Sequence, residues 1–329
     1  MASVPKREPA PGPGEATDAS SPAPSRSGGG EGGPDVVAIV GPTAAGKSEL
    51  AIAVARAVGG QVVNADSMQL YRGMDIGTAK LGAADRDGVT HHLLDVWDVR
   101  RTASVAHYQQ QARTVIDRLR AEGITAVLVG GSGLYVRAVL DDLQFPGTDP
   151  DVRDRLEAEL ARSGSQVMHA RLAVLAPTAA MSISPMNGRR VVRALEVVEL
   201  TGSFTATLPE LAPVYPAVRI GLDVPRPVLD LRIGDRVDRM WRLGFVDEVR
   251  RLASAHGLRE GMTASRALGY AQVLRLLEGT CSEDHARAET ARLTRRLARR
   301  QDTWFRREPV HWLAHDAPDL LPRALALLG

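Results

Sequence analysis

The clearest candidate for chemistry in this 329-residue sequence is a loop that could hold phosphate groups. It reads GPTAAGKS, fits the pattern G-x-x-x-x-G-K-[ST], and consists of Gly41, Pro42, Thr43, Ala44, Ala45, Gly46, Lys47 and Ser48. The glycines let backbone N–H groups turn toward an anion, Lys47 adds a positive charge, and Ser48 offers a hydroxyl to a phosphate-bound magnesium ion. The motif predicts a phosphate site and leaves open whether ATP or another diphosphate fills it.

Two more polar residues follow short apolar runs and could face the same ligand. Asp66 comes after QVVNA, and Ser132 lies in GGSG after ITAVLV. In an open parallel sheet, ligands bind beyond the carboxyl ends of the strands, so both residues are expected near the phosphate loop. A carboxylate there would help to hold magnesium in an NTPase, or it would cap the N-terminus of a helix in the segment that follows.

Strands and helices must alternate to place these residues at one edge of a sheet, and the sequence has that alternation. The phosphate loop lies between an apolar run, VVAIV, and a helical pattern, ELAIAVARAV. Further on come the strand QVVNA, the short extended segment HHLLDVWDV, a helix through HYQQQARTVIDRLRAEG, and a strand, glycine turn and helix in ITAVLVGGSGLYVRAVL. This order predicts an α/β fold with a parallel sheet and helices on its faces.

A helical insertion is expected to interrupt this sheet. Residues 145–216 contain DPDVRDRLEAELARSG and NGRRVVRALEVVELTG and no convincing strand. The sheet pattern resumes with VRIGLDVPR, a long helix through LDLRIGDRVDRMWRLG and a last strand in PVHWLAHD. We therefore predict a core in two parts, 35–144 and 217–329, on either side of an insertion at 145–216.

The composition is that of an ordinary globular protein, with 44% hydrophobic and 24% charged residues. Residues 1–34 differ, because they are rich in proline, glycine and serine, and we expect them to form a disordered tail. The sequence has no apolar stretch of the length of a signal peptide or a membrane span, and Cys281 is its one cysteine. We therefore expect a cytoplasmic protein without disulfides.

Arginines gather near the C-terminus. Between Arg287 and Arg307 they recur about one helical turn apart, at positions 292, 295, 296, 299 and 300. Such a row forms either a solvated helix face or a positive surface for a polyanion such as nucleic acid. The net charge of +2 does not decide between these interpretations, and both stay open.

Six motifs together resemble one family. In chain order they are GPTAAGKS, NADSMQLYRGMDIGTAK, LVGGSGLY, NGRRVVRALEV, SRALGY and RRLARRQDTWFR. This series, which runs from about Val36 to Leu313, resembles the tRNA dimethylallyltransferases, the bacterial tRNA prenyltransferases. The resemblance implies a P-loop NTPase-like parallel sheet with helices on both faces, interrupted by an all-helical insertion that binds tRNA.

The resemblance also implies a reaction. Such an enzyme transfers a dimethylallyl group from dimethylallyl diphosphate to N6 of the adenosine just 3′ of the anticodon, in tRNAs that read codons beginning with U. It works as a monomer with Mg²⁺, and its phosphate loop holds the prenyl donor instead of ATP. The expected partners are therefore the tRNA anticodon stem-loop and dimethylallyl diphosphate, with no membrane.

Matching the family's motifs assigns roles to individual residues. Asp66 corresponds to the catalytic aspartate, a general base that takes the proton from N6. Arg236, with Arg232 one turn earlier as a helper, would stabilise the departing diphosphate, and Ser48 would contact its magnesium ion. Ser132 is also assigned a catalytic role. It stands where most relatives have threonine, so it keeps the hydroxyl but lacks the methyl group that stiffens threonine.

The target base must leave its stack to reach a buried donor, so the family match also implies a set of tRNA contacts. These are Asp66, Ser67, Met68, Gln69, Ser132, Arg153, Arg189, Arg190, Val191, Val192, Arg193, Arg266, Ala267, Leu268, Gly269, Tyr270 and Ala271. One departure falls beside them, since Gly188 stands where relatives commonly have aspartate.

Two other functions use the same phosphate loop. An adenylate isopentenyltransferase prenylates a free nucleotide, but the long insertion and the arginine clusters favour a macromolecular acceptor. A small-molecule kinase or NTPase would need an adenine site, and no separate feature of the sequence requires one. Transfer to tRNA is the function that we predict.

Overall fold

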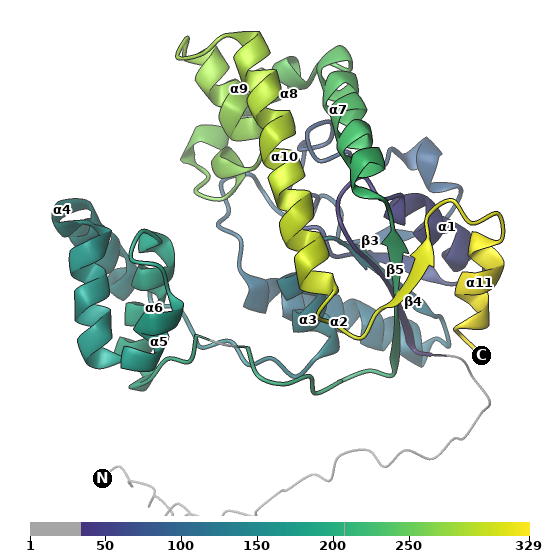
Figure 1. Ribbon diagram of the computed structural model, residues 1–329, viewed down its shortest axis with the longest axis horizontal. Coiled ribbons are helices and arrows are strands. Elements are labelled where there is room, and N and C mark those ends of the chain that lie inside the picture. The colour runs from purple at the N-terminus through teal and green to yellow at the C-terminus, as the bar shows by residue number, and fades with distance from the viewer. Residues whose placement is uncertain (1–33, 207) are drawn as a thin grey trace, which may run out of the picture. The chain divides into compact units, whose positions relative to one another are not determined.

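A parallel sheet of six strands forms the centre of the protein (Figure 1). The computed structural model describes residues 34–206 and 208–329, so almost all of the predicted tail, 1–34, lies outside the described residues. The strands are β1 Val36–Val40, β2 Gln61–Asn64, β3 His91–His92, β4 Ala126–Gly130, β5 Ala217–Asp223 and β6 His311–Ala314. They lie in the order β3-β2-β4-β1-β5-β6, and these neighbours pair in parallel.

Helices cover both faces of this sheet. They are α1 Lys47–Ala57 and α11 Leu320–Ala326 on one face, and α2 Val105–Ala121 and α3 Gly133–Leu140 on the other. Because side chains alternate along a strand, Ala38 and Val40 of β1 pack toward α2 and α3, while Val37 and Ile39 pack toward α1 and α11. The predicted α/β class, a P-loop-like parallel sheet between helices, is confirmed.

The extended segment expected in HHLLDVWDV forms less strand than its apolar residues suggest. Only His91 and His92 pair with β2. The backbone of Leu93 and Asp95 is left-handed, with φ of 61° and 59°, and this geometry ends the strand. The chain returns to the sheet edge at Trp97, which forms an isolated parallel bridge with Tyr71.

The insertion consists of three helices, α4 Pro150–Leu175, α5 Pro177–Ser182 and α6 Gly188–Thr201. Asp149 and Asn187 cap α4 and α6, because their side chains accept hydrogen bonds from N–H groups of the first turn. Gly164 interrupts α4 with a non-helical φ of 77° and ψ of 162°. The helices bury a cluster of their own that includes Leu156, Met168, Leu172, Val191 and Leu195. They occupy residues 150–201 of the predicted insertion, 145–216.

Four longer helices and three short 3-10 turns complete the described structure. The helices are α7 Arg226–Arg242, α8 Phe245–Ala255, α9 Tyr270–Leu277 and α10 Glu283–Phe305, and the turns are Ala83–Arg86, Leu258–Glu260 and Ala264–Arg266. Figure 1 shows α7 to α10 grouped beyond the carboxyl ends of the central strands, with α10 beside α7 and α9. In the part of the chain that the structure describes, every helix is too short or too polar to cross a lipid bilayer.

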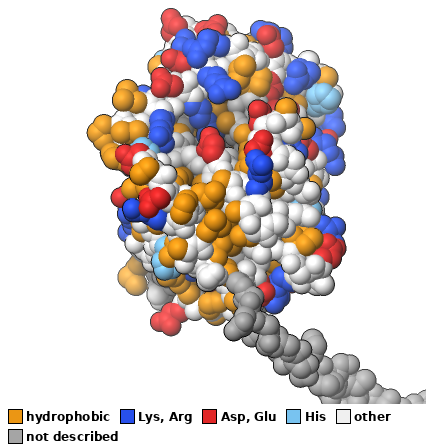
Figure 2. Space-filling model, turned by 90° about the vertical axis from the view of Figure 1, so that its right-hand side faces the viewer, with side chains coloured by type: hydrophobic (Ala, Val, Ile, Leu, Met, Phe, Trp, Pro, Cys, Tyr) orange, Lys and Arg blue, Asp and Glu red, His pale blue; other side chains and the backbone are white. Residues whose placement is uncertain are grey.

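The arginine row of α10 divides between helix packing and solvent. Arg287 pairs with Asp238 of α7 at 2.7 Å, and Arg295 donates a hydrogen bond to the backbone oxygen of Asp230 at 3.5 Å. Arg296 is exposed. On the face drawn in Figure 2, basic and acidic side chains are interspersed. Some arginines of α10 therefore contact α7. Contact of the other arginines with a polyanion stays a prediction.

Candidate active site

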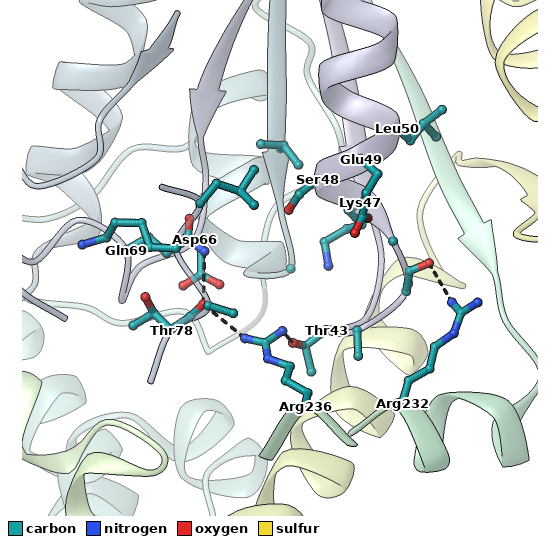
Figure 3. Close-up of a pocket in the computed structure, with 18 of the residues that line it drawn as sticks. Thr43, Lys47, Ser48, Glu49, Leu50, Asp66, Gln69, Thr78, Arg232 and Arg236 are labelled. Carbon is teal, nitrogen blue, oxygen red and sulfur yellow. Dashed lines mark hydrogen bonds between the residues drawn. The ribbon is translucent and has the colours of Figure 1, made fainter. Parts of the chain in front are cut away.

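A cavity of about 1080 Å³ opens at the carboxyl ends of β1, β2 and β4, where the sequence predicts a ligand (Figure 3). The residues that line it include Thr43, Lys47, Ser48, Asp66, Gln69, Thr78, Arg232, Arg236 and Gln301. They belong to the phosphate loop, to the segment after β2, and to α7 and α10. Parts of the chain that are distant in sequence therefore meet around one space.

The phosphate loop has the backbone shape that its glycines allow. Gly41 and Gly46 have φ of 128° and 101°, in the region that favours glycine, and α1 begins directly after the loop at Lys47. The Nζ of Lys47 donates a hydrogen bond to the backbone oxygen of Pro42 at 2.7 Å. Loop N–H groups, the helix N-terminus and the ammonium group together suit an anion with several phosphate oxygens.

Burial lowers the pKa of Lys47 to about 8. Removing an ammonium group from water favours its neutral form, and the positive charge of Arg236 acts in the same direction. The negative charge of Asp66 opposes both effects. Lys47 is therefore mostly charged at neutral pH but close to losing its proton.

The affinity of this site for a diphosphate is expected to fall as the pH rises through about 8, the pKa of Lys47. Below that pH the free protein carries the charged lysine, and above it binding must first restore the proton. The fall approaches about tenfold per pH unit until the pKa of the complex is reached. Calorimetry with inorganic diphosphate and Mg²⁺ across this range measures it. Lys47→Arg, which stays charged, is the control, and equal pH slopes for both proteins would contradict the assignment.

Arg236 of α7 joins the phosphate loop to the segment after β2. Its Nη1 donates to Oγ1 of Thr43 at 2.9 Å, and its Nη2 donates to the backbone oxygen of Thr78 at 3.1 Å (Figure 3). Its Nε is buried and has no hydrogen-bond partner among the described residues. Burial lowers the pKa of this guanidinium, although Asp66 and Glu49 oppose the shift. A partly buried cation with one unpaired donor fits an anionic ligand in the cavity.

Arg232, the predicted helper, lies one turn earlier on α7 and also lines the cavity. Its Nη1 donates to the backbone oxygen of Ala45 at 3.4 Å (Figure 3). Its Nη2 lies 3.2 Å from Nδ1 of His315. It is therefore held against the outer part of the phosphate loop. A second positive charge near the same anion is consistent with a supporting role.

Asp66 follows β2 and is fixed by hydrogen bonds on both sides. The Oδ1 of Asn64 accepts from its backbone N–H at 2.9 Å, and the Nδ2 of Asn64 donates to its backbone oxygen at 3.0 Å. Its own Oδ1 accepts from the N–H of Met68 at 2.9 Å. No helix follows Asp66 before the 3-10 turn Ala83–Arg86, so the prediction of a helix cap is wrong. One carboxylate oxygen holds a turn instead, the carboxylate also lines the cavity, and its role as general base stays a prediction.

Ser132 lies at the carboxyl end of β4 as the residue that precedes α3, and its side chain forms no capping bond. Gly130 and Gly131 line the cavity, but Ser132 is not among the lining residues. The glycines around it are required by α10: a Cβ at Gly131 would lie 2.4 Å from Nε2 of Gln301, and one at Gly133 would lie 2.2 Å from Nε1 of Trp304. The catalytic role of Ser132 stays a prediction.

Gln301 is a site residue that the sequence reasoning missed. Its Oε1 accepts a hydrogen bond from the backbone N–H of Thr43 at 2.9 Å, so α10 holds the phosphate loop directly. The residue lies inside the motif RRLARRQDTWFR, but no local pattern there indicates a partner 258 positions away. Only the packing of α10 over the loop reveals the contact.

Ser48 and Asp66 offer oxygen atoms to the cavity, and oxygen is the ligand type that Mg²⁺ prefers. Among the residues that the structure describes, no group of three or more His, Cys, Asp or Glu side chains could hold a metal ion. A magnesium ion here would therefore take most of its ligands from phosphate oxygens and water. The donor set fits a metal that binds together with a phosphate ligand.

Two of the arginines predicted to contact tRNA in the insertion are tied to a buried carboxylate. Glu196 is fully buried and pairs with both Arg153 and Arg193. Burial alone would raise the pKa of Glu196, but the hydrogen bonds from the two arginines lower it. Arg193 also donates to the backbone oxygens of Pro146 and Gly147, at 2.7 and 3.1 Å. Both arginines therefore have a structural role, and their contact with tRNA stays a prediction.

The remaining insertion residues divide by exposure. Arg189 and Arg190 are exposed, whereas Val191 and Val192 are buried in the core of the insertion. Contact of this segment with RNA would therefore fall to the arginines. Gly188 stands where relatives commonly have aspartate. A Cβ at this position would lie 2.9 Å from Cδ1 of Leu160, so the leucine side chain occupies the space beside the glycine.

The segment RALGYA behaves similarly. Arg266 is exposed, but Gly269 and Tyr270 are buried, and the hydroxyl of Tyr270 donates to Oε1 of Glu248 at 2.6 Å. The side chain of Tyr270 therefore belongs to the protein interior. Its inclusion among the tRNA contacts followed from the motif, because the motif does not distinguish a buried residue from an exposed one.

Comparisons with known proteins agree with this geometry. A family model described as IPP transferase matches residues 69–308. The tRNA dimethylallyltransferase of Thermobifida fusca (strain YX) is 64% identical over 300 residues, which cover 89% of this chain and 94% of that protein. The tRNA dimethylallyltransferase of Streptomyces griseus is also 64% identical, over 90% of this chain and 96% of that protein.

Solved structures give the same result for the fold. The full-length tRNA isopentenylpyrophosphate transferase of Bacillus halodurans is 41% identical, with a TM-score of 0.65 over 89% of this chain and 93% of that chain. A eukaryotic dimethylallyltransferase acting on tRNA is 23% identical, with a TM-score of 0.75 over 89% of this chain and 77% of that chain, and this likeness concerns the fold alone.

Proposed function

The chain belongs to the IPP transferase family, and from this premise we propose that it transfers a dimethylallyl group from dimethylallyl diphosphate to tRNA. The acceptor is N6 of the adenosine just 3′ of the anticodon, in tRNAs that read codons beginning with U. The observation that carries the proposal is the meeting of a phosphate loop, a partly buried arginine and a carboxylate, Asp66, around one cavity. The family to which the six motifs pointed is confirmed.

Negative charge develops on the diphosphate as its bond to the prenyl carbon breaks. The N–H groups of the phosphate loop, the ammonium of Lys47 and the guanidinium of Arg236 are already in place to receive it. Donors fixed before the reaction stabilise such charge without reorganisation. Mg²⁺, held by the diphosphate oxygens with Ser48, would supply further neutralisation of that charge.

The acceptor amine must lose a proton as it gains a carbon. The bond between N6 and the prenyl carbon forms, the bond from that carbon to the diphosphate oxygen breaks, and the proton of N6 passes to the carboxylate of Asp66. The hydrogen bond from the N–H of Met68 holds that carboxylate, and two hydrogen bonds between Asn64 and the backbone of Asp66 hold the residue. Ser132 is proposed to contact the donor or the amine from the adjacent strand end.

The adenosine must be extruded from the anticodon loop to enter the cavity. We assign phosphate contacts to the exposed arginines of the predicted set, Arg189, Arg190 and Arg266, and contacts with the entering nucleotide to Gln69, which lines the cavity. Action as a monomer in the cytoplasm stays a prediction from the sequence.

A transfer assay tests the proposal. The protein is incubated with radiolabelled dimethylallyl diphosphate, Mg²⁺ and one acceptor. Separate reactions contain unmodified tRNA that has adenosines beside the anticodon, AMP, or ATP. Label on this tRNA, and none on the same tRNA with guanosine at the target position, is the expected result. Label on AMP or ATP only would assign the protein to free-nucleotide transfer, and ATP hydrolysis without transfer would mean that the loop holds ATP.

A further inference from the structure

A buried carboxylate outside the cavity organises the segment that reaches Arg236. Glu248 of α8 is 2% exposed, and it accepts hydrogen bonds from three successive backbone N–H groups. Its Oε2 accepts from Asp75 at 3.1 Å and from Ile76 at 2.7 Å, and its Oε1 accepts from Gly77 at 3.2 Å. Successive N–H groups that converge on one anion form a rigid nest. One side chain therefore fixes the backbone of residues 75–77.

Two aromatic rings next to Glu248 pack against the same segment. A Cβ at Gly77 would lie 2.3 Å from Cε2 of Phe245 and 2.5 Å from Cε2 of Tyr270, so only glycine fits against this pair. The rings of Phe245 and Tyr270 meet edge to face, with centroids 5.1 Å apart. The hydroxyl of Tyr270 completes the arrangement by donating to Glu248. Among the described residues, Glu248 thus accepts four hydrogen bonds, all from uncharged donors, and forms no ion pair.

The next residue in the chain connects this arrangement to the cavity. The backbone oxygen of Thr78 accepts hydrogen bonds from Nη2 of Arg236 at 3.1 Å and from Nε2 of Gln69 at 3.2 Å. The position of that oxygen follows from the backbone of residues 75–77. Glu248 therefore lies only a few covalent and hydrogen bonds from the guanidinium of Arg236 without touching the cavity itself.

We propose that Glu248 and Tyr270 are positioning residues, which fix the backbone oxygen of Thr78 so that the guanidinium of Arg236 is aimed at the donor diphosphate. This inference rests on the proposed function, in which Arg236 binds that diphosphate. In the described part of the chain, Arg236 has two acceptors, Oγ1 of Thr43 and the oxygen of Thr78. Loss of the second frees the guanidinium to rotate about the first, and the diphosphate then has to order it.

The negative charge of Glu248 is needed because every neighbour is a donor. An amide in its place keeps one accepting oxygen but directs an NH₂ group at backbone N–H groups, which leaves buried donors unpaired. Glu248→Gln is therefore expected to let residues 75–78 shift while the fold is kept. Glu248→Asp keeps the charge on a shorter side chain and is expected to retain part of the function. Tyr270→Phe removes a single hydroxyl and weakens the arrangement least.

Binding of inorganic diphosphate with Mg²⁺, measured by calorimetry, tests the inference without tRNA or transfer. Glu248→Gln is expected to raise the dissociation constant by about tenfold and Tyr270→Phe by about threefold. Glu248→Asp is expected to raise it by an amount between these two values. The matched control is Tyr215→Phe, which removes the hydroxyl of another buried tyrosine from a carboxylate, Asp117, at 2.9 Å. Tyr215 precedes the amino end of β5, whereas the phosphate loop follows the carboxyl end of β1. If Tyr270→Phe and Tyr215→Phe bind diphosphate equally well, the inference is overturned.

A double-mutant cycle separates positioning from general stability. If Glu248 acts through Arg236, Glu248→Gln has almost no further effect on diphosphate affinity in an Arg236→Ala protein, while it lowers the melting temperature in both backgrounds. Equal and additive losses of affinity in the two backgrounds would overturn the inference. Should Glu248→Gln fail to fold, Tyr270→Phe enters the same cycle. Diphosphate binding is measured without tRNA. Failure of transfer to tRNA would therefore reject the proposed function, but it would not change the binding result that tests the role of Glu248.

Discussion

Asp66→Asn is expected to lower the rate of prenyl transfer by about a hundredfold to ten-thousandfold while the donor still binds. Asparagine has nearly the same shape as aspartate and keeps an oxygen that can accept the N–H of Met68, so the turn after β2 is retained. It has no basic oxygen for the proton of N6. The bond to the prenyl carbon must then form without a proton acceptor, and single-turnover transfer to tRNA with saturating donor measures the loss.

Two further variants make this result specific. Asp66→Ala removes the base and the hydrogen bond of the turn together, so a melting temperature well below that of Asp66→Asn would show how much the bond from the N–H of Met68 contributes. Asp75→Asn removes another carboxylate from the same cavity, one that pairs with Lys80 at 2.7 Å and is 52% exposed. Its transfer rate is expected to stay within about threefold of the unchanged protein. A rate for Asp66→Asn within about tenfold of the unchanged protein would rule out the role as general base.

The parts of the site that the sequence predicts are the ones with local signals. The phosphate loop combines glycine spacing with a strand before it and a helix after it, and the structure places Lys47 and Ser48 in the cavity as that pattern requires. Asp66 was expected at the same edge because parallel strands end together, and it lines the same cavity. The sheet was predictable for a similar reason, since buried apolar runs and helical patterns alternate along the chain.

The parts that were missed depend on contacts between distant segments. Glu248 reads as one acidic residue on an amphipathic helix, and only the fold brings three backbone N–H groups 171 to 173 positions away onto its carboxylate. Gln301 and the loop N–H that it binds are separated even further. The arginines of α10 looked like one charged row, although acidic residues of α7 pair with part of it. Periodicity indicates which face a residue is on but not which element packs against that face.

Burial explains why motif membership and ligand contact differ. Tyr270 and Val191 lie in motifs that match the family, yet both side chains are fully buried. A motif records every residue that a site needs, including those that hold its framework. Tyr270 acts on the framework through Glu248, and the same distinction applies to Arg153, whose guanidinium is paired with a buried carboxylate. An exposed residue such as Arg266 is the better candidate for a direct RNA contact.

Arg236→Ala is expected to reduce kcat/KM for dimethylallyl diphosphate by about a hundredfold to a thousandfold. The guanidinium is partly buried beside the phosphate loop, where its charge is less screened than at the open surface, and it meets a ligand whose negative charge increases in the transition state. Much of the loss should therefore appear in kcat, with a smaller rise in KM for the donor. Steady-state kinetics with the donor varied at saturating tRNA measure both quantities.

The comparison with Arg236→Lys and Arg239→Ala shows whether geometry or charge alone is at work. Lysine keeps the charge but has one nitrogen in place of the planar fork whose two nitrogens reach Oγ1 of Thr43 and the oxygen of Thr78, so only part of the activity should return. Arg239 lines the same cavity but is exposed, and its replacement should change kcat/KM by no more than about threefold.

Equal losses for Arg236→Ala and Arg239→Ala would mean that the cavity needs positive charge without a particular position. Full activity of Arg236→Lys would mean that the two fixed acceptors do not matter. The expected order, with Arg236→Ala lowest, Arg236→Lys intermediate and Arg239→Ala near the unchanged protein, follows only if the guanidinium acts where Thr43 and Thr78 hold it.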